Sequence, residues 1–188
     1  MRINVVFRDA ISPRDFFEFT NETQWPFHGA HPATESAPAE LTWSTPAGAG
    51  IHLIEDEALG IIYISIENYS IEGVLERDLQ EAADIISERF EAIEPEELVD
   101  LYHSVSDWNE KVLALMMVAA AAGEQSEEIC TVVKDGLRSS NPDVRKAAVI
   151  ASMYTPWDDL KILVEIVAES DPDENTRDLA AASLANFA

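Results

Sequence analysis

The feature that most constrains the fold is a phrase that occurs twice near the C-terminal end of the chain. Residues 141–148 read NPDVRKAA and residues 173–180 read DENTRDLA, so Arg145 and Arg177 stand 32 residues apart, each opening an alanine-rich helical pattern. A degenerate third copy lies upstream, where Lys111 precedes VLAL, 34 residues before Arg145. Helical units that repeat at this length bury their apolar faces only against their neighbours, as in an α-solenoid, and such arrays mostly bind partners. The repeat therefore predicts a helical binding protein.

Helix start signals occur at six places in the second half of the chain. A capping residue, a proline or both precede an apolar-periodic segment at each place. These places are 94–97, 107–110, 126–128, 141–143, 155–157 and 171–173. The short intervals between them predict about three antiparallel helix pairs. The longest apolar run, 112–122, is too short to span a bilayer and is predicted to be a buried core helix.

The phrase at 141–148 resembles the second-helix signature of HEAT repeats. The resemblance covers about residues 106–188, although Thr176 stands where the family usually has valine. It implies a protein-binding scaffold whose units bond to one another through the Asp and Arg of the motif. The residues given that structural role by the resemblance are Asp143, Arg145 and Arg177.

The first half of the chain has a different pattern. Short β-rich runs predict strands, and Ser12 and Ser70 stand where N-caps would open helices. The predicted strands are 3–7, 41–45, 51–55 and 61–67. The order β-α-β-β-β-α predicts an α+β fold, with a small antiparallel sheet domain over residues 1–93 and a short all-α HEAT-like solenoid over residues 94–188.

Residues 23–39 contain three prolines and little periodicity, so they are predicted to form a long loop. Trp25 in this loop has two interpretations, a plug for the core or an anchor for a partner. His28 and His31, with Glu35 nearby, have the spacing of a possible metal site, but chance is the favoured interpretation because no further Cys or His lies in the loop. No metal and no cofactor is expected.

The charge of the chain is extreme, with 36 acidic and 12 basic residues and a net charge of −24. Residues 1–100 carry 21 acidic and 5 basic side chains, and residues 101–188 carry 15 and 7, so both halves are acidic. A field of that sign repels nucleic acid and anionic lipid and attracts basic proteins. The competing explanation is solubility or a high-salt habitat, which the low count of four lysines fits.

Sequence signatures of catalysis are missing from the chain: it contains no P-loop, GxGxxG, GxSxG, HExxH or Cys-x-x-Cys motif. The protein is therefore expected not to be an enzyme; a small enzyme would need a pocket lined by His28, His31 or His52. Cys130 is the only cysteine, and no signal peptide is visible at the start, so a cytoplasmic protein is expected.

These observations predict a non-catalytic protein–protein binding module. The combination of a sheet domain, a helical array and acidity is similar in outline to small acidic bacterial immunity proteins that neutralise toxins, which implies a basic partner such as a nuclease toxin. The candidate contacts are Glu55, Asp56, Glu57, Glu124, Glu127, Glu128 and Trp25. The alternative is a structural or regulatory HEAT-repeat scaffold whose acidity serves only solubility or habitat. Neither nucleic acid nor membrane is an expected partner.

Overall fold

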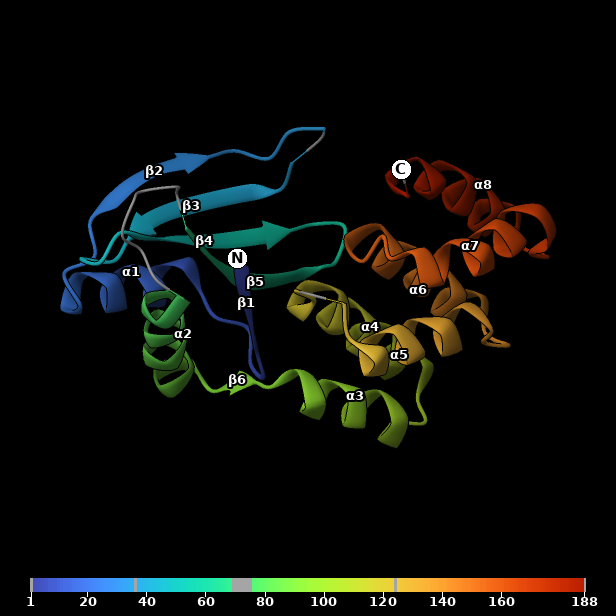
Figure 1. Ribbon diagram of the computed structural model, residues 1–188, viewed down its shortest axis with the longest axis horizontal. Coiled ribbons are helices and arrows are strands. Elements are labelled where there is room, and N and C mark those ends of the chain that lie inside the picture. The colour runs from blue at the N-terminus through green and yellow to red at the C-terminus, as the bar shows by residue number, and fades with distance from the viewer. Residues whose placement is uncertain (1, 36, 69–75, 124, 188) are drawn as a thin grey trace. The chain divides into compact units, whose positions relative to one another are not determined.

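The computed structural model of the chain is shown in Figure 1 and describes residues 2–35, 37–68, 76–123 and 125–187. The chain consists of two compact units, Met1–Ile93 and Glu94–Ala188. The first unit contains an antiparallel sheet and the second is helical, so the fold is α+β, as predicted. Among the described residues, every helix is too short or too polar to cross a membrane.

The first unit is a six-stranded antiparallel sheet with two helices. Its elements are β1 (Arg2–Phe7), α1 (Pro13–Glu22), β2 (Phe27–His31), β3 (Ala39–Ser44), β4 (Ala49–Asp56), β5 (Ile61–Asn68), α2 (Glu76–Phe90) and β6 (Ala92–Ile93). The strands lie in the order β2-β3-β4-β5-β1-β6, so β2 and β6 form the two edges. The four predicted strands correspond to β1, β3, β4 and β5, and Ser12 caps α1 by accepting a hydrogen bond from the amide of Asp15.

The core of this unit lies between one face of the sheet and the helices α1 and α2 (Figure 1). Because side chains alternate along a strand, Ile51 and Leu53 of β4 point to this face together. Trp43 of β3 is fully buried and meets the ring of Phe16 from α1 edge-on at 5.1 Å. Leu79 and three further residues of α2 complete the cluster.

The prediction of one long loop over residues 23–39 is wrong. Strand β2 lies inside this segment and pairs with β3, with a bulge between Phe27 and Gly29. Its sequence, FHGAH, carries no apolar alternation, so its extended conformation depends on pairing with β3 and not on a local pattern. The two-residue strand β6 was missed for the same reason. The predicted cap Ser70 lies outside the described residues.

In the described part of the second unit there are six α-helices, and each begins within or one residue after one of the six predicted places. They are α3 (Pro95–Ser104), α4 (Trp108–Ala121), α5 (Glu127–Leu137), α6 (Pro142–Tyr154), α7 (Asp158–Ser170) and α8 (Glu174–Ser183), followed by the short η1 (Leu184–Asn186). The side chains of four N-cap residues accept hydrogen bonds from the first turns of their helices. These residues are Asp107, Ser126, Asn141 and Asp173.

The six helices form three pairs in two rows. Each pair packs together, as α3 with α4, α5 with α6 and α7 with α8. Helix α6 contacts α4 on one side and α8 on the other, which forms one row, and α5 contacts α3 and α7 in the same way to form the other row. The apolar run of α4, with eight consecutive buried residues from Ala114, lies within this stack, as the prediction of a core helix required.

The repeated sequence motif forms the same hydrogen bond in two successive helix pairs. Nη1 of Arg145 donates to the carbonyl oxygen of Ser139 at 3.0 Å, and Nη1 of Arg177 donates to that of Asp171, in each case six residues upstream. Arg145 also binds the Asp171 side chain, which belongs to the turn before α8. Both arginines are therefore structural, whereas the Asp143 side chain is exposed.

Candidate functional site

The structure separates the three acidic residues predicted at the tip between β4 and β5. Glu55 and Glu57 are exposed, whereas Asp56 is only 3% exposed. Oδ1 of Asp56 accepts hydrogen bonds from the amides of Ala58 at 3.0 Å and Leu59 at 3.1 Å. The Asp56 carboxylate therefore stabilises the turn, which corrects its assignment as a partner contact.

Trp25 lies in the core and not on the surface. The residue is 7% exposed, and its ring meets that of Phe19 edge-on with the ring centroids 5.3 Å apart. This burial agrees with the core-plug interpretation and corrects the assignment of Trp25 as a partner contact. The exposed aromatic residue of this segment is Phe27, which is 46% exposed and packs on Trp43 at 5.2 Å.

One of the acidic residues predicted at the start of α5, Glu127, lines a hollow between α5 and α7. Glu127 and Glu128 are both exposed, and Glu124 lies outside the described residues. The hydroxyl of Ser126 donates to Glu128 at 2.8 Å and lowers the pKa of that carboxyl. Glu127 lines the hollow together with Lys134, whose Nζ lies 3.9 Å from Oδ2 of Asp159. The ammonium group of Lys134 therefore already lies in this hollow, beside the acidic side chains.

Glu55 lines a pocket of about 300 Å³ on the face of the sheet that packs against α1 and α2. Most of its walls are apolar, from Pro13, Ala30, Pro32, Ala39, Leu41, Leu53 and Ile62. The strand register explains the set, because Leu41 lies opposite Leu53, and Glu55 lies opposite Ala39 on one side and Ile62 on the other. All of these side chains consequently share one face of the sheet.

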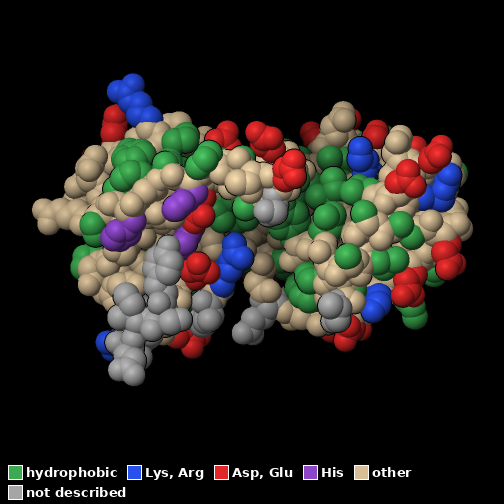
Figure 2. Space-filling view, turned by 90° about the horizontal axis from the view of Figure 1, so that it is seen from above, with side chains coloured by type: hydrophobic (Ala, Val, Ile, Leu, Met, Phe, Trp, Pro, Cys, Tyr) green, Lys and Arg blue, Asp and Glu red, His purple; other side chains and the backbone are tan. Residues whose placement is uncertain are grey.

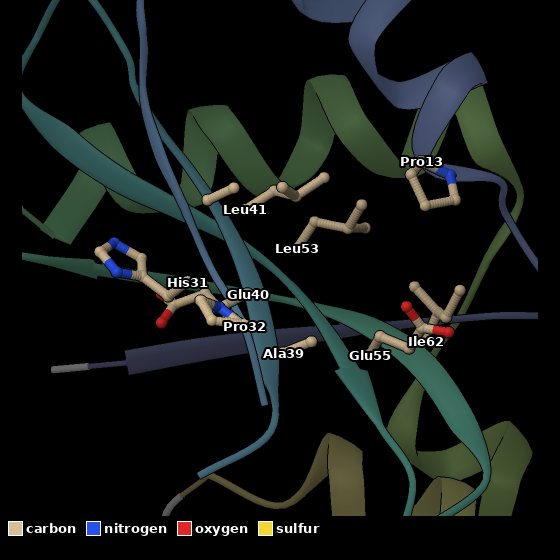
Figure 3. Close-up of a pocket in the computed structure, with 10 residues that line it drawn as sticks. Pro13, His31, Pro32, Ala39, Glu40, Leu41, Leu53, Glu55 and Ile62 are labelled. Carbon is tan, nitrogen blue, oxygen red and sulfur yellow. The ribbon is translucent and has the colours of Figure 1, made fainter. Parts of the chain in front are cut away.

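Figure 3 shows how the charged residues lie around this pocket. The Glu55 carboxylate lies beside Ile62, on the same side of this view as Pro13, which also lines the pocket. The ring of His31 points away from Leu41 and Leu53. His31 and Glu40 also line the pocket, and no lysine or arginine is among the described lining residues, so no Lys or Arg side chain of this pocket pairs with the Glu55 carboxylate.

The opposite face of the sheet carries a polar cluster centred on His52, which is 7% exposed. Nδ1 of His52 contacts Oε1 of Glu40, and Nε2 lies 3.3 Å from Oε1 of Glu67. Ser65 lies opposite His52 in the register, and its hydroxyl oxygen accepts a hydrogen bond of 2.6 Å from Nε of Arg2. Figure 2 shows histidine side chains beside acidic and basic ones on the surface of this unit.

The polar cluster is a network that sequence analysis missed, apart from His52. Period-two alternation places Glu40, His52 and Glu67 on one face, but the strand order was needed to bring them together. Tyr63 on the same face is 4% exposed, and burial raises the pKa of its phenol against the opposing effect of Arg2. The phenol therefore stays protonated at neutral pH.

The two histidines of β2 lie on the edge of the sheet and are both exposed. Nε2 of His28 lies 2.8 Å from the hydroxyl oxygen of Ser44. In the part of the chain that the structure describes, no three His, Cys, Asp or Glu side chains are arranged to hold a metal ion. Glu35, the third predicted member of that group, is exposed.

Comparison with known proteins returns no relative: no family model, no curated protein and no solved structure matches the chain. The function is therefore argued from the residues and surfaces of the molecule itself.

Proposed function

We propose that the protein is a non-catalytic binding module for a basic protein, and that the Glu55 pocket receives a lysine or arginine side chain of that partner. The observation that carries the proposal is the division of the pocket into apolar walls and an acidic rim. Lysine and arginine have the matching division, with an apolar stem and a charged head. A side chain of this kind would bury its stem against Leu41 and Leu53 and pair its head with Glu55.

Long-range electrostatics support the same partner. The net charge of −24 steers a basic protein toward the molecule and repels an acidic one. Steering alone does not give specificity, because exposed ion pairs contribute only about 0–1 kcal/mol. The apolar pocket supplies additional binding free energy, because it removes the stem of the basic side chain from water.

The helical unit supports a binding role of the HEAT kind. Its three pairs in two rows, the repeated phrase and the interlocking Arg145 and Asp171 are features that such an array would have. In its sharpest version the proposal makes the protein an immunity or inhibitor protein that covers the basic surface of a toxin such as a nuclease. Glu57, Glu127 and Glu128 are exposed and would contribute peripheral contacts.

The test is affinity capture from native extract at about 50 mM and about 500 mM NaCl, with mass spectrometry of the retained proteins. The captured partner is then titrated against the wild type, Glu55→Gln and Glu57→Gln. Glu57 is the matched control because it is exposed and only two residues from Glu55, in the turn after β4, but does not line the pocket.

We expect a basic partner that is retained at low salt and lost at high salt. Glu55→Gln should weaken its binding about tenfold or more, and Glu57→Gln about threefold or less. Equal retention at both salts, equal effects of the two substitutions, or no retained basic protein would each contradict the proposal.

A second candidate function is a scaffold that binds through apolar surface. It is favoured by two exposed residues one turn apart on α7, Ile162 at 66% and Ile166 at 53% exposed. Such association would be insensitive to salt and would be lost in Ile162→Glu, while Glu55→Gln would leave it unchanged.

A further inference from the structure

We infer that the partner presents an extended segment that pairs with the edge strand β2, and that the basic side chain entering the Glu55 pocket is an arginine of that segment. This inference rests on the proposed function and specifies the form of the partner. It combines three observations: an open sheet edge, the lack of charge on that edge, and the position of the pocket beside it.

Strand β2 is the first strand of the sheet and pairs on one side only, with β3. Four of its five residues, Phe27–His31, are exposed, and in the part of the chain that the structure describes no strand pairs with its outer side. An edge of this kind presents backbone N–H and C=O groups that an extended peptide can pair with.

The sequence of β2 does little to discourage such pairing. Proteins commonly protect an edge strand with charged side chains, but FHGAH contains no Lys, Arg, Asp or Glu. Pro26 and Pro32 flank the strand and limit pairing to the five residues between them. Phe27, which is 46% exposed, offers apolar contact to a side chain of an added strand.

The pocket opens on the helical face directly beside β2. Ala30 lies opposite Leu41, and Leu41 lies opposite Leu53, so these three form one row that leads from the edge into the pocket. A residue added opposite Ala30 would place its side chain on the same face of the sheet as this row, and the small Ala30 side chain leaves room for it to bend toward the pocket.

Side-chain length favours arginine. Neighbouring strands lie about 4.8 Å apart, so an added strand would be about 14 Å from β4, and Glu55 lies two residues beyond this row on β4, opposite Ala39. Arginine is the basic side chain that reaches furthest toward a Glu55 side chain extended to meet it. Arginine also offers the planar fork that binds a carboxylate through two hydrogen bonds.

A second copy of this chain is a poor occupant of the edge. Its β2 carries no basic residue to place in the pocket, and two molecules of net charge −24 repel each other. The segment therefore belongs to a partner of opposite charge.

The probe is a seven-residue peptide of alternating threonine and valine with a central arginine, capped at both ends. Two further peptides carry N-methyl groups on alternate residues, one on the odd-numbered positions and the other on the even-numbered positions. Each peptide therefore lacks a different set of backbone N–H donors, and its charge is unchanged. Binding to the unaltered full chain is measured by calorimetry, and the amide signals of Ala30 and His31 are followed by NMR. All probes meet the same folded protein, so misfolding of a variant does not enter.

Because alternate N–H groups of an added strand face β2, we expect one methylated peptide to bind at least about tenfold more weakly than the parent and the other to bind nearly as well. Replacing the central arginine by lysine should weaken binding, and the Ala30 and His31 amides should shift only with peptides that bind. Equal affinities of both methylated peptides, or no binding of the parent peptide at about 1 mM, would overturn strand pairing.

Glu55→Gln separates this inference from the proposed function. If the parent peptide binds the wild type about tenfold more tightly than Glu55→Gln but both methylated peptides bind alike, the pocket proposal stands and strand pairing is wrong. If only one methylated peptide binds and Glu55→Gln has no effect, strand pairing stands and the role of Glu55 is wrong.

Discussion

Arg145 is the residue on which two successive helix pairs of the second unit meet. Its side chain is 11% exposed, and that of Asp171, its partner, is 2% exposed. Nε and Nη2 of Arg145 donate to the two carboxylate oxygens of Asp171 at 2.6 and 2.9 Å, a bidentate arrangement. Nη1 donates to the carbonyl oxygens of Ser139 and Ser140. The guanidinium is thus satisfied on three sides in a place with little water.

Removing one partner should cost more than removing both. We expect Asp171→Ala to lower the free energy of unfolding by about 3–5 kcal/mol, because it leaves the buried Arg145 charge unpaired. The double variant Arg145→Met with Asp171→Leu should lose less, since it leaves no buried charge. Urea denaturation of both variants checks this, with Asp178→Ala as the control because Asp178 is an exposed aspartate of α8. A single variant no less stable than the double one would contradict the expectation.

The same pair predicts a dependence of stability on acid. The hydrogen bond from Arg145 holds the pKa of Asp171 below its ordinary value of 3.8. Since the unfolded state takes up this proton first, the contribution of Asp171 is complete above pH 3.8 and is lost as the pH falls through the lower, folded pKa. Denaturation curves of wild type and Asp171→Asn should therefore differ by a constant amount above this pH and converge below it. A difference that persists unchanged into stronger acid would exclude this linkage.

At the scale of the element, α5 packs closely on its neighbours because of one glycine. A Cβ atom at Gly136 would lie 2.8 Å from Cβ of Ala148 in α6 and 3.1 Å from Cδ1 of Leu115 in α4. We expect Gly136→Ala to destabilise the protein by about 1–3 kcal/mol through overpacking, although alanine favours a helix by up to about 1 kcal/mol. Thermal and urea unfolding measure the change. Thr131→Ala, at an exposed position of the same helix, should be nearly neutral, and a stabilised Gly136→Ala would show that the helices separate without cost.

Elements with local signals were predicted from the sequence, and those formed by distant pairing were not. The caps at Asp107, Asn141 and Asp173 act within one helical turn, so the starts of α4, α6 and α8 could be read directly. Strand β2 is extended because it pairs with β3, and neither this pairing nor the bulge within it is predicted by a local sequence pattern. The site follows the same division. Glu55 was predicted as an exposed acid, but its pocket draws on α1, β2, β3, β4 and β5 and required the register of the sheet.

At the scale of the whole molecule, the acidity is shared by the two units. Residues 1–93 carry 17 acidic and 5 basic side chains, and residues 94–188 carry 19 and 7, so each unit has a net charge of −12. Few of these charges are neutralised by the ion pairs of the described residues, which include the buried pair of Arg145 and the exposed pair of Arg14 with Glu18. Self-repulsion of this size favours the more expanded unfolded chain.

Salt should therefore stabilise the protein near neutral pH. The Debye length falls from about 30 Å at 0.01 M to about 3 Å at 1 M salt, which screens repulsion between exposed carboxylates more than it weakens the buried pair of Arg145. We expect the thermal unfolding midpoint at pH 7 to rise steadily with NaCl over this range. The control is the same titration near the isoelectric point of 4.2, where the net charge vanishes and the rise should largely disappear. An equal rise at both pH values would mean that NaCl acts on the folded state by a route other than screening, and the acidity would then carry no measurable cost in stability.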